Sequence, residues 1–335
     1  MRQRLTVGVG AVALTVAMFA LNFYRMPVVA LSPGPVEDVL GRVRVEGGAK
    51  VYNSSGKLYL TSVGLDDNVR FYEALLDLAN HDVQLRPRRE LFPADETPEE
   101  VDQQGATDMD ESKATASVVA LRRLGYRVDP SAVRVAQVVR NAPADGRLAP
   151  GDRILEVDDQ KVASVEDVQA AIARHRVGDR VLFAVRRDGA DRDVAVRVGV
   201  DEGKPRVGVL LSNLFEQLPV RVNIDTEDII GPSAGLMFTL SVIDKLTAED
   251  LTGGRRIAGT GEIDLAGEVS PIGGIAEKLI AARRRGVTVF LIPKANCAEV
   301  RGHVPAGLRL VQVASVDDAL RFLRQPPATA AAAGC

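Results

Sequence analysis

The hydrophobic pattern at the N-terminus differs from that of the rest of the chain. Residues Leu5 to Phe23 form an uncharged, mostly apolar run of 19 that follows Arg2 and Arg4. A run of this length can cross a bilayer as a helix, and the positive-inside rule then leaves everything after Tyr24 outside the cytoplasm. The alternative is a cleaved signal peptide, since Val28-Val29-Ala30 loosely resembles a cleavage site. Both interpretations predict an extracytoplasmic body, and the length of the run favours an uncleaved anchor.

Short periodic segments follow the helix-breaking stretch Leu31-Ser32-Pro33-Gly34-Pro35. Alternation of apolar and polar residues predicts a strand at 57–63, and the patterns at 71–79 and 114–124 predict helices. The segment 86–111 combines arginines, prolines and acidic residues. We expect a solvated loop there, with a mobile flap as the alternative.

The remaining pattern mixes strands and helices, which predicts an α+β fold. Strands are predicted at 154–157, 180–186, 193–198, 207–211, 220–224, 257–260 and 287–293, and helices at 165–173, 236–246, 275–282 and 316–323. With 335 residues, two or three units are expected. We place an anchor at 1–31, a β/α region at 32–124, a β-rich module at 125–203, an α/β domain at 204–325 and a disordered tail at 326–335.

Composition excludes several functions. The formal charge of −3, without a basic stripe interleaved with aromatic residues, argues against nucleic-acid binding. The two cysteines, Cys297 and Cys335, cannot form a disulfide framework or a zinc site, and we expect Cys297 to be a buried or idle thiol. Neither an HExxH motif nor clustered metal ligands occur, so no metal or cofactor is predicted.

The segment Gly231-Pro232-Ser233-Ala234-Gly235 is a candidate for nucleophilic chemistry. It precedes the apolar run 236–242, which predicts a helix N-terminus with Pro232 in the first turn. The backbone at Pro232, Ser233 and Ala234 would then stabilise an oxyanion beside the Ser233 hydroxyl.

The serine needs a base. None of the three histidines, His81, His175 and His303, lies in a recognisable catalytic setting. Helical spacing instead places Lys278 on an apolar face with Ile275, Leu279 and Ala282, while Glu277 points elsewhere. Burial would lower the pKa of the lysine until its free amine can remove the serine proton.

GPSAG followed by TGEIDLAGEVSPIGGIAEKLIAARRRGVTVFLIPKAN resembles the proteolytic domain of the Lon protease family, a Ser-Lys peptidase class. The resemblance implies Ser233 as nucleophile, Lys278 as general base and Thr260 as the residue that positions the lysine. The family usually has an acidic residue where Ile230 stands here. Asp225, Glu227 and Asp228 are the nearby substitutes.

Two plainer interpretations compete with this resemblance. G-x-S-x-G is also the nucleophile elbow of α/β-hydrolases, for which His303 could be nominated, although that fold needs more strand-helix units than the chain supplies. Lys278 taken alone is more often a surface lysine with a buried stem. Its coupling to the serine and threonine motifs favours the Lon-like interpretation.

The segment 125–203, with Leu148-Ala149-Pro150-Gly151-Asp152 before a strand, resembles a PDZ domain. Such a domain binds an extended peptide by strand addition. The resemblance implies a carboxylate-binding loop at Leu124, Gly125, Tyr126, Arg127 and Val128, opposite the helix 165–173; a spacer without a ligand is the alternative. GKLYLTSV and the later helix beginning ES are similar to the start of the Lon proteolytic domain, which would make that domain discontinuous.

Together these features predict a membrane-anchored serine endopeptidase that acts on extracytoplasmic proteins or peptides recruited by the PDZ domain. No G-x-x-x-x-G-K-[ST] occurs in the sequence, so we expect cleavage without ATP. Assembly into a homo-oligomer is compatible with the sequence. The alternative is a peptide-binding scaffold with an inactive peptidase domain, which the departure at Ile230 would support.

Overall fold

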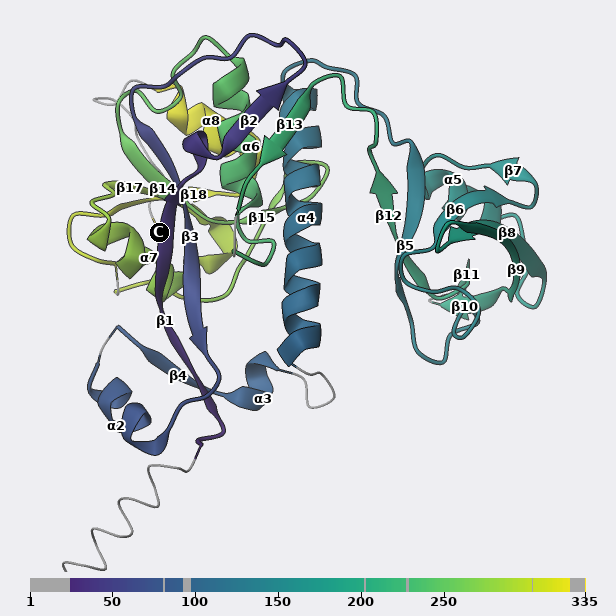
Figure 1. The fold of residues 1–335 in the computed structure, drawn as a ribbon, viewed down its shortest axis with the longest axis horizontal. Helices are drawn as coiled ribbons and strands as arrows, with labels where there is room; N and C mark the ends of the chain where they lie inside the picture. Colours follow the sequence, from purple (N-terminus) through teal and green to yellow (C-terminus); the bar gives the residue numbers. More distant parts are fainter. Residues whose placement is uncertain are drawn as a thin grey trace, which may run out of the picture. The chain divides into compact units, whose positions relative to one another are not determined.

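The computed structural model describes residues 25–80, 82–92, 98–201, 203–226, 229–302, 304–325 and 335. The predicted anchor at 5–23, His81, His303 and tail residues 326–334 lie outside these residues. Among the helices within them, none is both long and apolar enough to cross a membrane. The mixed α+β character of the fold is confirmed (Figure 1).

The chain folds into two compact units. The first joins the residues up to Leu124 to those from Val220 onward, and the second comprises Gly125–Pro219. The first unit is therefore discontinuous, with the second inserted into it. The expected boundary between 203 and 204 is wrong, since the chain remains in the second unit up to Pro219.

A six-stranded mixed sheet forms the centre of the first unit (Figure 1). Its strands, in spatial order, are β18 (Arg309–Val313), β17 (Val289–Pro293), β14 (Arg256–Gly259), β3 (Lys57–Asp66), β1 (Val28–Asp38) and β4 (Gln84–Pro87). The strands from β18 to β3 run parallel, whereas β1 is antiparallel to both of its neighbours. Two-stranded ribbons accompany the sheet: β2 (Val43–Glu46) with β13 (Arg221–Ile224), and β15 (Glu262–Ile263) with β16 (Val269–Ser270).

Both faces of the sheet are covered, because alternate residues of its strands enter different cores. Leu58, Leu60 and Ile257 pack with helices α4 (Pro98–Arg123), α6 (Gly235–Leu246) and α8 (Val316–Leu323). Their neighbours Tyr59 and Ala258 pack on the other face with helix α7 (Ile275–Arg284). The predicted serine and lysine segments therefore belong to opposite layers of one unit.

The expected loop at 86–111 is wrong. The structure forms β4, the short helix α3 (Arg88–Leu91) and then the 26-residue helix α4, which begins at Pro98. Proline suits the first position of a helix, and the acidic residues that follow it favour the positive end of the helix dipole. Packing of α4 against α6 through Met109, Ala116 and Val119 outweighs the polar composition of its first half.

A smaller substructure surrounds the first residues that the structure describes. β1 and β3 extend past β14, which pairs only with Lys57–Leu60, as an arm that carries β4, α3 and α2 (Phe71–Ala79) (Figure 1). The prediction of a helix at 71–79 is confirmed.

The second unit is built on a sheet with the order β12 (Val209–Leu214), β5 (Ala132–Val138), β6 (Arg153–Val157), β8 (Arg180–Arg187) and β9 (Ala190–Arg197). β7 (Gln160–Lys161) pairs with β6, and β10 (Gly199–Asp201) with β11 (Lys204–Arg206). Helix α5 (Val165–Ile172) lies where an amphipathic helix was predicted. The strand predicted at 207–211 does not lead to the serine loop but pairs, as β12, with β5.

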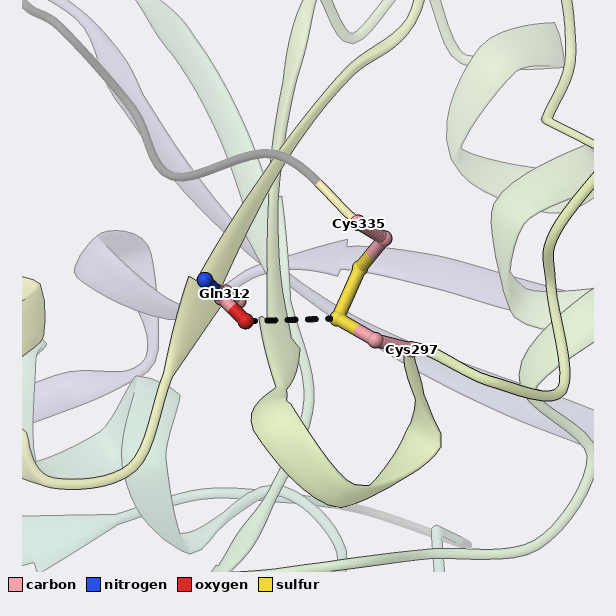
Figure 2. The surroundings of a disulfide bond; sticks show 3 residues. All are labelled: Cys297, Gln312 and Cys335. Carbon is pink, nitrogen blue, oxygen red and sulfur yellow. Dashed lines mark hydrogen bonds between the residues drawn. A yellow bond between two sulfur atoms is a disulfide. The ribbon is translucent and has the colours of Figure 1, made fainter.

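Cys297 and Cys335 form a disulfide, so Cys297 is buried as expected but the expectation of a thiol there is wrong (Figure 2). Cys297 follows the single turn η2 (Lys294–Asn296). Its sulfur lies 3.9 Å from the Oε1 of Gln312 on β18. The bond fixes the last residue of the chain to the first unit. Disulfide pairing is predicted from the spacing of several cysteines. Two cysteines 38 residues apart have no such pattern.

Candidate active site

The serine lies in a turn in front of α6. Ser233 belongs to the turn at 231–234, and α6 begins at Gly235, so Pro232 precedes the helix instead of occupying its first turn. Gly231 has a φ of 91°, a left-handed conformation that favours glycine. Helix α4 holds this turn at two points: the Gly231 N–H donates to the Gly105 carbonyl at 2.8 Å, and the Ser112 hydroxyl donates to the Pro232 carbonyl at 3.0 Å.

The candidates for oxyanion stabilisation change in one respect. Pro232 has no N–H, so it cannot donate to an oxyanion, and its carbonyl accepts the Ser112 hydroxyl. The N–H of Gly231 is bonded to Gly105 and that of Gly235 donates to the Pro232 carbonyl at 3.3 Å. This leaves the backbone of Ser233 and Ala234 as the donors next to the nucleophile.

The lysine comes from the opposite layer. Helix α7 begins after Gly274, whose φ is 67° and where an added Cβ would lie 2.5 Å from Val63 of β3. Only glycine fits this combination of conformation and space, and the close approach brings α7 against the sheet. Lys278 is 3% exposed. Glu277 was expected to point away from the core, but it is buried as well, and burial raises its pKa.

Ser233, Lys278 and Thr260 meet at the end of β14. The Lys278 Nζ lies 2.8 Å from the Ser233 Oγ and 3.0 Å from the Thr260 Oγ1. The Thr260 hydroxyl donates to the Ser233 carbonyl at 2.9 Å. Because that bond uses its only proton, Thr260 can only accept from the lysine amine. A neutral amine held this way keeps its lone pair for the Ser233 hydroxyl, which is the arrangement that proton abstraction requires.

Burial lowers the pKa of Lys278 from 10.5 to about 7. The physical cause is desolvation, which disfavours the ammonium form. Ile230, in place of an acidic residue, lines the cleft and lies against Gly105 of α4. Of the proposed acidic substitutes, Asp225 has its backbone tied to Arg42, and Glu227 and Asp228 lie outside the described residues. Among the residues that the structure describes, burial is therefore the cause that lowers the pKa of the amine toward neutrality.

A cleft of about 430 Å³ opens beside Ser233 and Lys278. Most of its wall is apolar. The apolar side chains include Leu60 and Leu65 of β3, Leu31 of β1, Met109 of α4, and Ile229 and Ile230 before the serine. Such a wall can bind apolar side chains of an extended polypeptide.

The nucleophile-elbow alternative lacks its scaffold. An elbow joins a strand of the central sheet directly to the helix behind the serine. Here β13, the strand before the serine, pairs with β2 in a separate ribbon, and residues 225–234 intervene. His175 belongs to the second unit, where its Nε2 lies 2.6 Å from Asp158.

The second unit has its own groove, with a volume of about 680 Å³. Its walls are α5, through Val165, Gln169 and Ile172, and the segment 206–211 that leads into the edge strand β12. None of the described residues 124–128, where the carboxylate-binding loop is predicted, is among the residues that line this groove. The triplet Val207-Gly208-Val209, at the start of β12, lines the groove instead. Gly208 has a φ of 82°, and an added Cβ would collide with Ala142.

Two protein-family models match this chain, one over the part that holds Ser233 and Lys278 and one over most of the second unit. Residues 213–324 match the Lon protease (S16) C-terminal proteolytic domain, and residues 108–198 match the PDZ domain. The chain carries a Lon-type proteolytic domain and a PDZ domain. The first is the domain of a Ser-Lys peptidase family, in agreement with the two side chains that meet at 2.8 Å.

Individual relatives match over part of their length. A Lon protease of Chloroflexus aggregans is 38% identical over 115 residues, which cover 33% of this chain and 14% of that protein. A Lon protease of Clostridium beijerinckii is 32% identical over 188 residues, or 51% of this chain and 23% of that protein. The PDZ domain of the SdrC-like protein from Listeria monocytogenes is 26% identical with a TM-score of 0.24, covering 26% of this chain and 93% of that domain. The chain thus spans a small part of the Lon proteases that it resembles.

The Lon-type site should depend on pH through Lys278. The amine accepts a proton from Ser233 only when it is neutral, and its pKa is about 7. We expect kcat/KM for a fluorogenic peptide to fall as the pH drops through 7 and to level off above about 8. Circular dichroism over the same range separates this titration from unfolding. A profile that is flat between pH 6 and 9 contradicts the neutral-lysine base.

Ser112 should act as a positioning residue. Its hydroxyl fixes the Pro232 carbonyl, so Ser112→Ala removes a hydrogen bond worth about 1 kcal/mol and frees the turn that carries Ser233. We expect kcat to fall several-fold with little change in KM. Ser117→Ala is the matched control, because Ser117 is also buried on α4 but donates to the Lys113 carbonyl of its own helix. Equal effects of the two substitutions on kcat would refute the positioning role.

Proposed function

We propose that the protein is a membrane-anchored, ATP-independent serine endopeptidase that cleaves extracytoplasmic proteins recruited by its PDZ unit. The observation that supports this proposal best is the 2.8 Å contact between the buried Lys278 amine and the Ser233 hydroxyl. The family matches concern the proteolytic domain and the PDZ domain as such. Anchoring, substrate class and recruitment are the steps that go beyond it.

The reaction follows from the geometry of the site. Lys278 accepts the Ser233 proton as the hydroxyl oxygen attacks the scissile carbonyl carbon. The backbone N–H groups of Ser233 and Ala234 stabilise the resulting oxyanion. The lysine then returns its proton to the leaving amine, and an acyl-enzyme forms on Ser233. A water molecule, deprotonated by the same amine, hydrolyses this ester and releases the second product.

Two features favour an extracytoplasmic location. The apolar run at 5–23 has the length of a bilayer-spanning helix and follows two arginines. The disulfide between Cys297 and Cys335 is a bond that persists in oxidising compartments and is rare in the cytosol. The sequence has no G-x-x-x-x-G-K-[ST] motif for nucleotide binding, so we expect no ATP-dependent unfolding of substrates. This favours substrates that are already flexible.

The groove of the second unit supports recruitment of a peptide. Within the described residues β12 is an edge strand beside β5, and its residues Val209, Leu210 and Leu211 line the groove together with α5. An extended peptide can add to such an edge as a further strand. Leu210 of β12 is 55% exposed in this groove and offers an apolar contact to the peptide.

Substitution of the two central residues tests the enzyme. Ser233→Ala and Lys278→Arg should each abolish cleavage of a casein-like unfolded protein by the purified full chain without ATP. Arginine fails because its guanidinium does not become a neutral base. Wild-type activity in either variant would reject the mechanism. A wild-type protein that binds peptides but cleaves none would support the scaffold alternative, which the replacement of an acidic residue by Ile230 favours.

Recruitment predicts a selective defect. Leu210→Asp places a charge in the groove, so it should weaken binding of a peptide with an apolar C-terminus tenfold or more and slow cleavage of unfolded proteins. Cleavage of a short fluorogenic peptide should stay unchanged. Leu182→Asp is the control, since Leu182 is 38% exposed on β8 of the same unit and does not line the groove. Isothermal titration calorimetry and the two cleavage assays measure these effects, and equal losses for both variants would count against the groove.

A further inference from the structure

Helix α2 turns its apolar face away from the protein. Of its nine residues only Ala74 is buried, whereas Tyr72, Leu75, Leu76 and Leu78 are 40%, 54%, 66% and 72% exposed. At 100° per residue the exposed apolar side chains share one continuous side of the helix. The acidic residues Glu73 and Asp77 share the other. A soluble surface helix has the opposite arrangement, with its apolar stripe facing the core.

The helix is firmly held despite this exposure. Ala74 packs in a small core with Ala30 and Val69, supported by Met26, Val28, Val83 and Leu85. Its first turn is closed by Glu73, whose carboxylate accepts the Arg70 N–H at 2.8 Å and the Tyr72 hydroxyl at 2.8 Å. The outward apolar face is therefore a fixed feature of the fold and not a consequence of a loosely attached segment.

The start of α2 lies beside Arg25 and Met26, the first residues that the structure describes. Arg25 forms an antiparallel bridge with Arg70, the residue that caps α2, and the Met26 N–H donates to the Val69 carbonyl at 2.9 Å. The run at 5–23 ends two residues before Arg25. Two residues of extended chain reach about 7 Å. If the run crosses a bilayer, α2 begins within that distance of the lipid surface.

We propose that α2 is a membrane-docking helix whose apolar face, formed by Tyr72, Leu75, Leu76 and Leu78, lies in the interface of the bilayer in which the N-terminal run is anchored. The proposal rests on the proposed anchoring. Amphipathic helices of this kind bury their apolar side about 5–10 Å into the boundary between headgroups and acyl chains. Glu73 and Asp77 lie on the other side of the helix, so no acidic side chain of α2 has to enter the interface.

A second copy of the chain is a poorer partner for this face. A stable dimer buries about 800 Å² on each partner. Nine helical residues extend only about 14 Å at 1.5 Å per residue, with a diameter of about 10 Å. The face of α2 is too small to hold two copies together, whereas a lipid interface needs no minimum area because the transmembrane run already supplies the attachment.

The chain contains no tryptophan, so one substitution introduces a unique fluorescent reporter. Leu76→Trp in the full chain is reconstituted into vesicles of phosphatidylcholine and phosphatidylglycerol with and without brominated acyl chains. We expect the tryptophan to emit at a shorter wavelength than a water-exposed tryptophan in buffer. Brominated lipid should quench this emission by half or more. Leu78→Trp is a second reporter on the same face. Val51→Trp, at a 44% exposed position outside α2, is the control and should stay unquenched.

Each outcome decides the proposal. Quenching of both α2 reporters without quenching at position 51 supports it. Absence of quenching at positions 76 and 78 overturns it, and flotation of the same vesicles after alkaline extraction shows separately whether the N-terminal run is inserted. Blue-shifted emission that ignores brominated lipid but increases with protein concentration also overturns it, in favour of self-association. Peptide cleavage by the reporters should equal that of the wild type, since α2 does not line the cleft.

Discussion

The site depends on a buried amine whose pKa is lowered by desolvation. Lys278 is 3% exposed, and desolvation lowers its pKa to about 7, so a large fraction is neutral at physiological pH. A carboxylate within hydrogen-bonding reach would stabilise the ammonium form and raise that pKa. Ile230, which lines the same cleft, adds no charge there, so it is compatible with a lysine whose pKa is lowered by burial. Thr260 orients the amine, because its hydroxyl oxygen accepts a hydrogen bond from it.

Much of the first unit serves to bring two layers together at this point. The serine turn precedes a helix on one face of the sheet, and the lysine comes from a helix on the other. They meet at the end of β14, where Thr260 follows Gly259. An added Cβ at Gly259 would lie 2.6 Å from Met237 of α6 and 3.0 Å from Leu291 of β17. The absence of a side chain lets α6 approach the strand closely enough for the Ser233 carbonyl to accept both the Gly261 N–H and the Thr260 hydroxyl.

The sequence predicted the parts of this arrangement whose signal is local. Helical spacing around Lys278, the amphipathic helix at 165–173 and the serine motif could each be recognised within a few residues. The errors concern partners that are distant in sequence. Composition at 98–111 indicates a loop, but contacts with α6 make it a helix. The sequence of the strand at 207–211 does not indicate to which unit it belongs, because this depends on its pairing with β5. The disulfide required knowledge that Cys335 returns to Cys297.

The insertion of the PDZ unit has a structural consequence for the serine. The chain leaves the first unit at the end of α4 and returns to it at β13. Gly105 and Ser112 of α4 hold the turn that carries Ser233, and the segment that follows β13 leads directly into that turn. Both connections to the inserted unit thus run through the supports of the nucleophile. Since a shift of about 1 Å in a catalytic group can cost two orders of magnitude in rate, a fold with this connectivity must keep α4 rigid at its contact with the turn. The packing of Met109, Ala116 and Val119 against α6, on either side of Ser112, provides that rigidity.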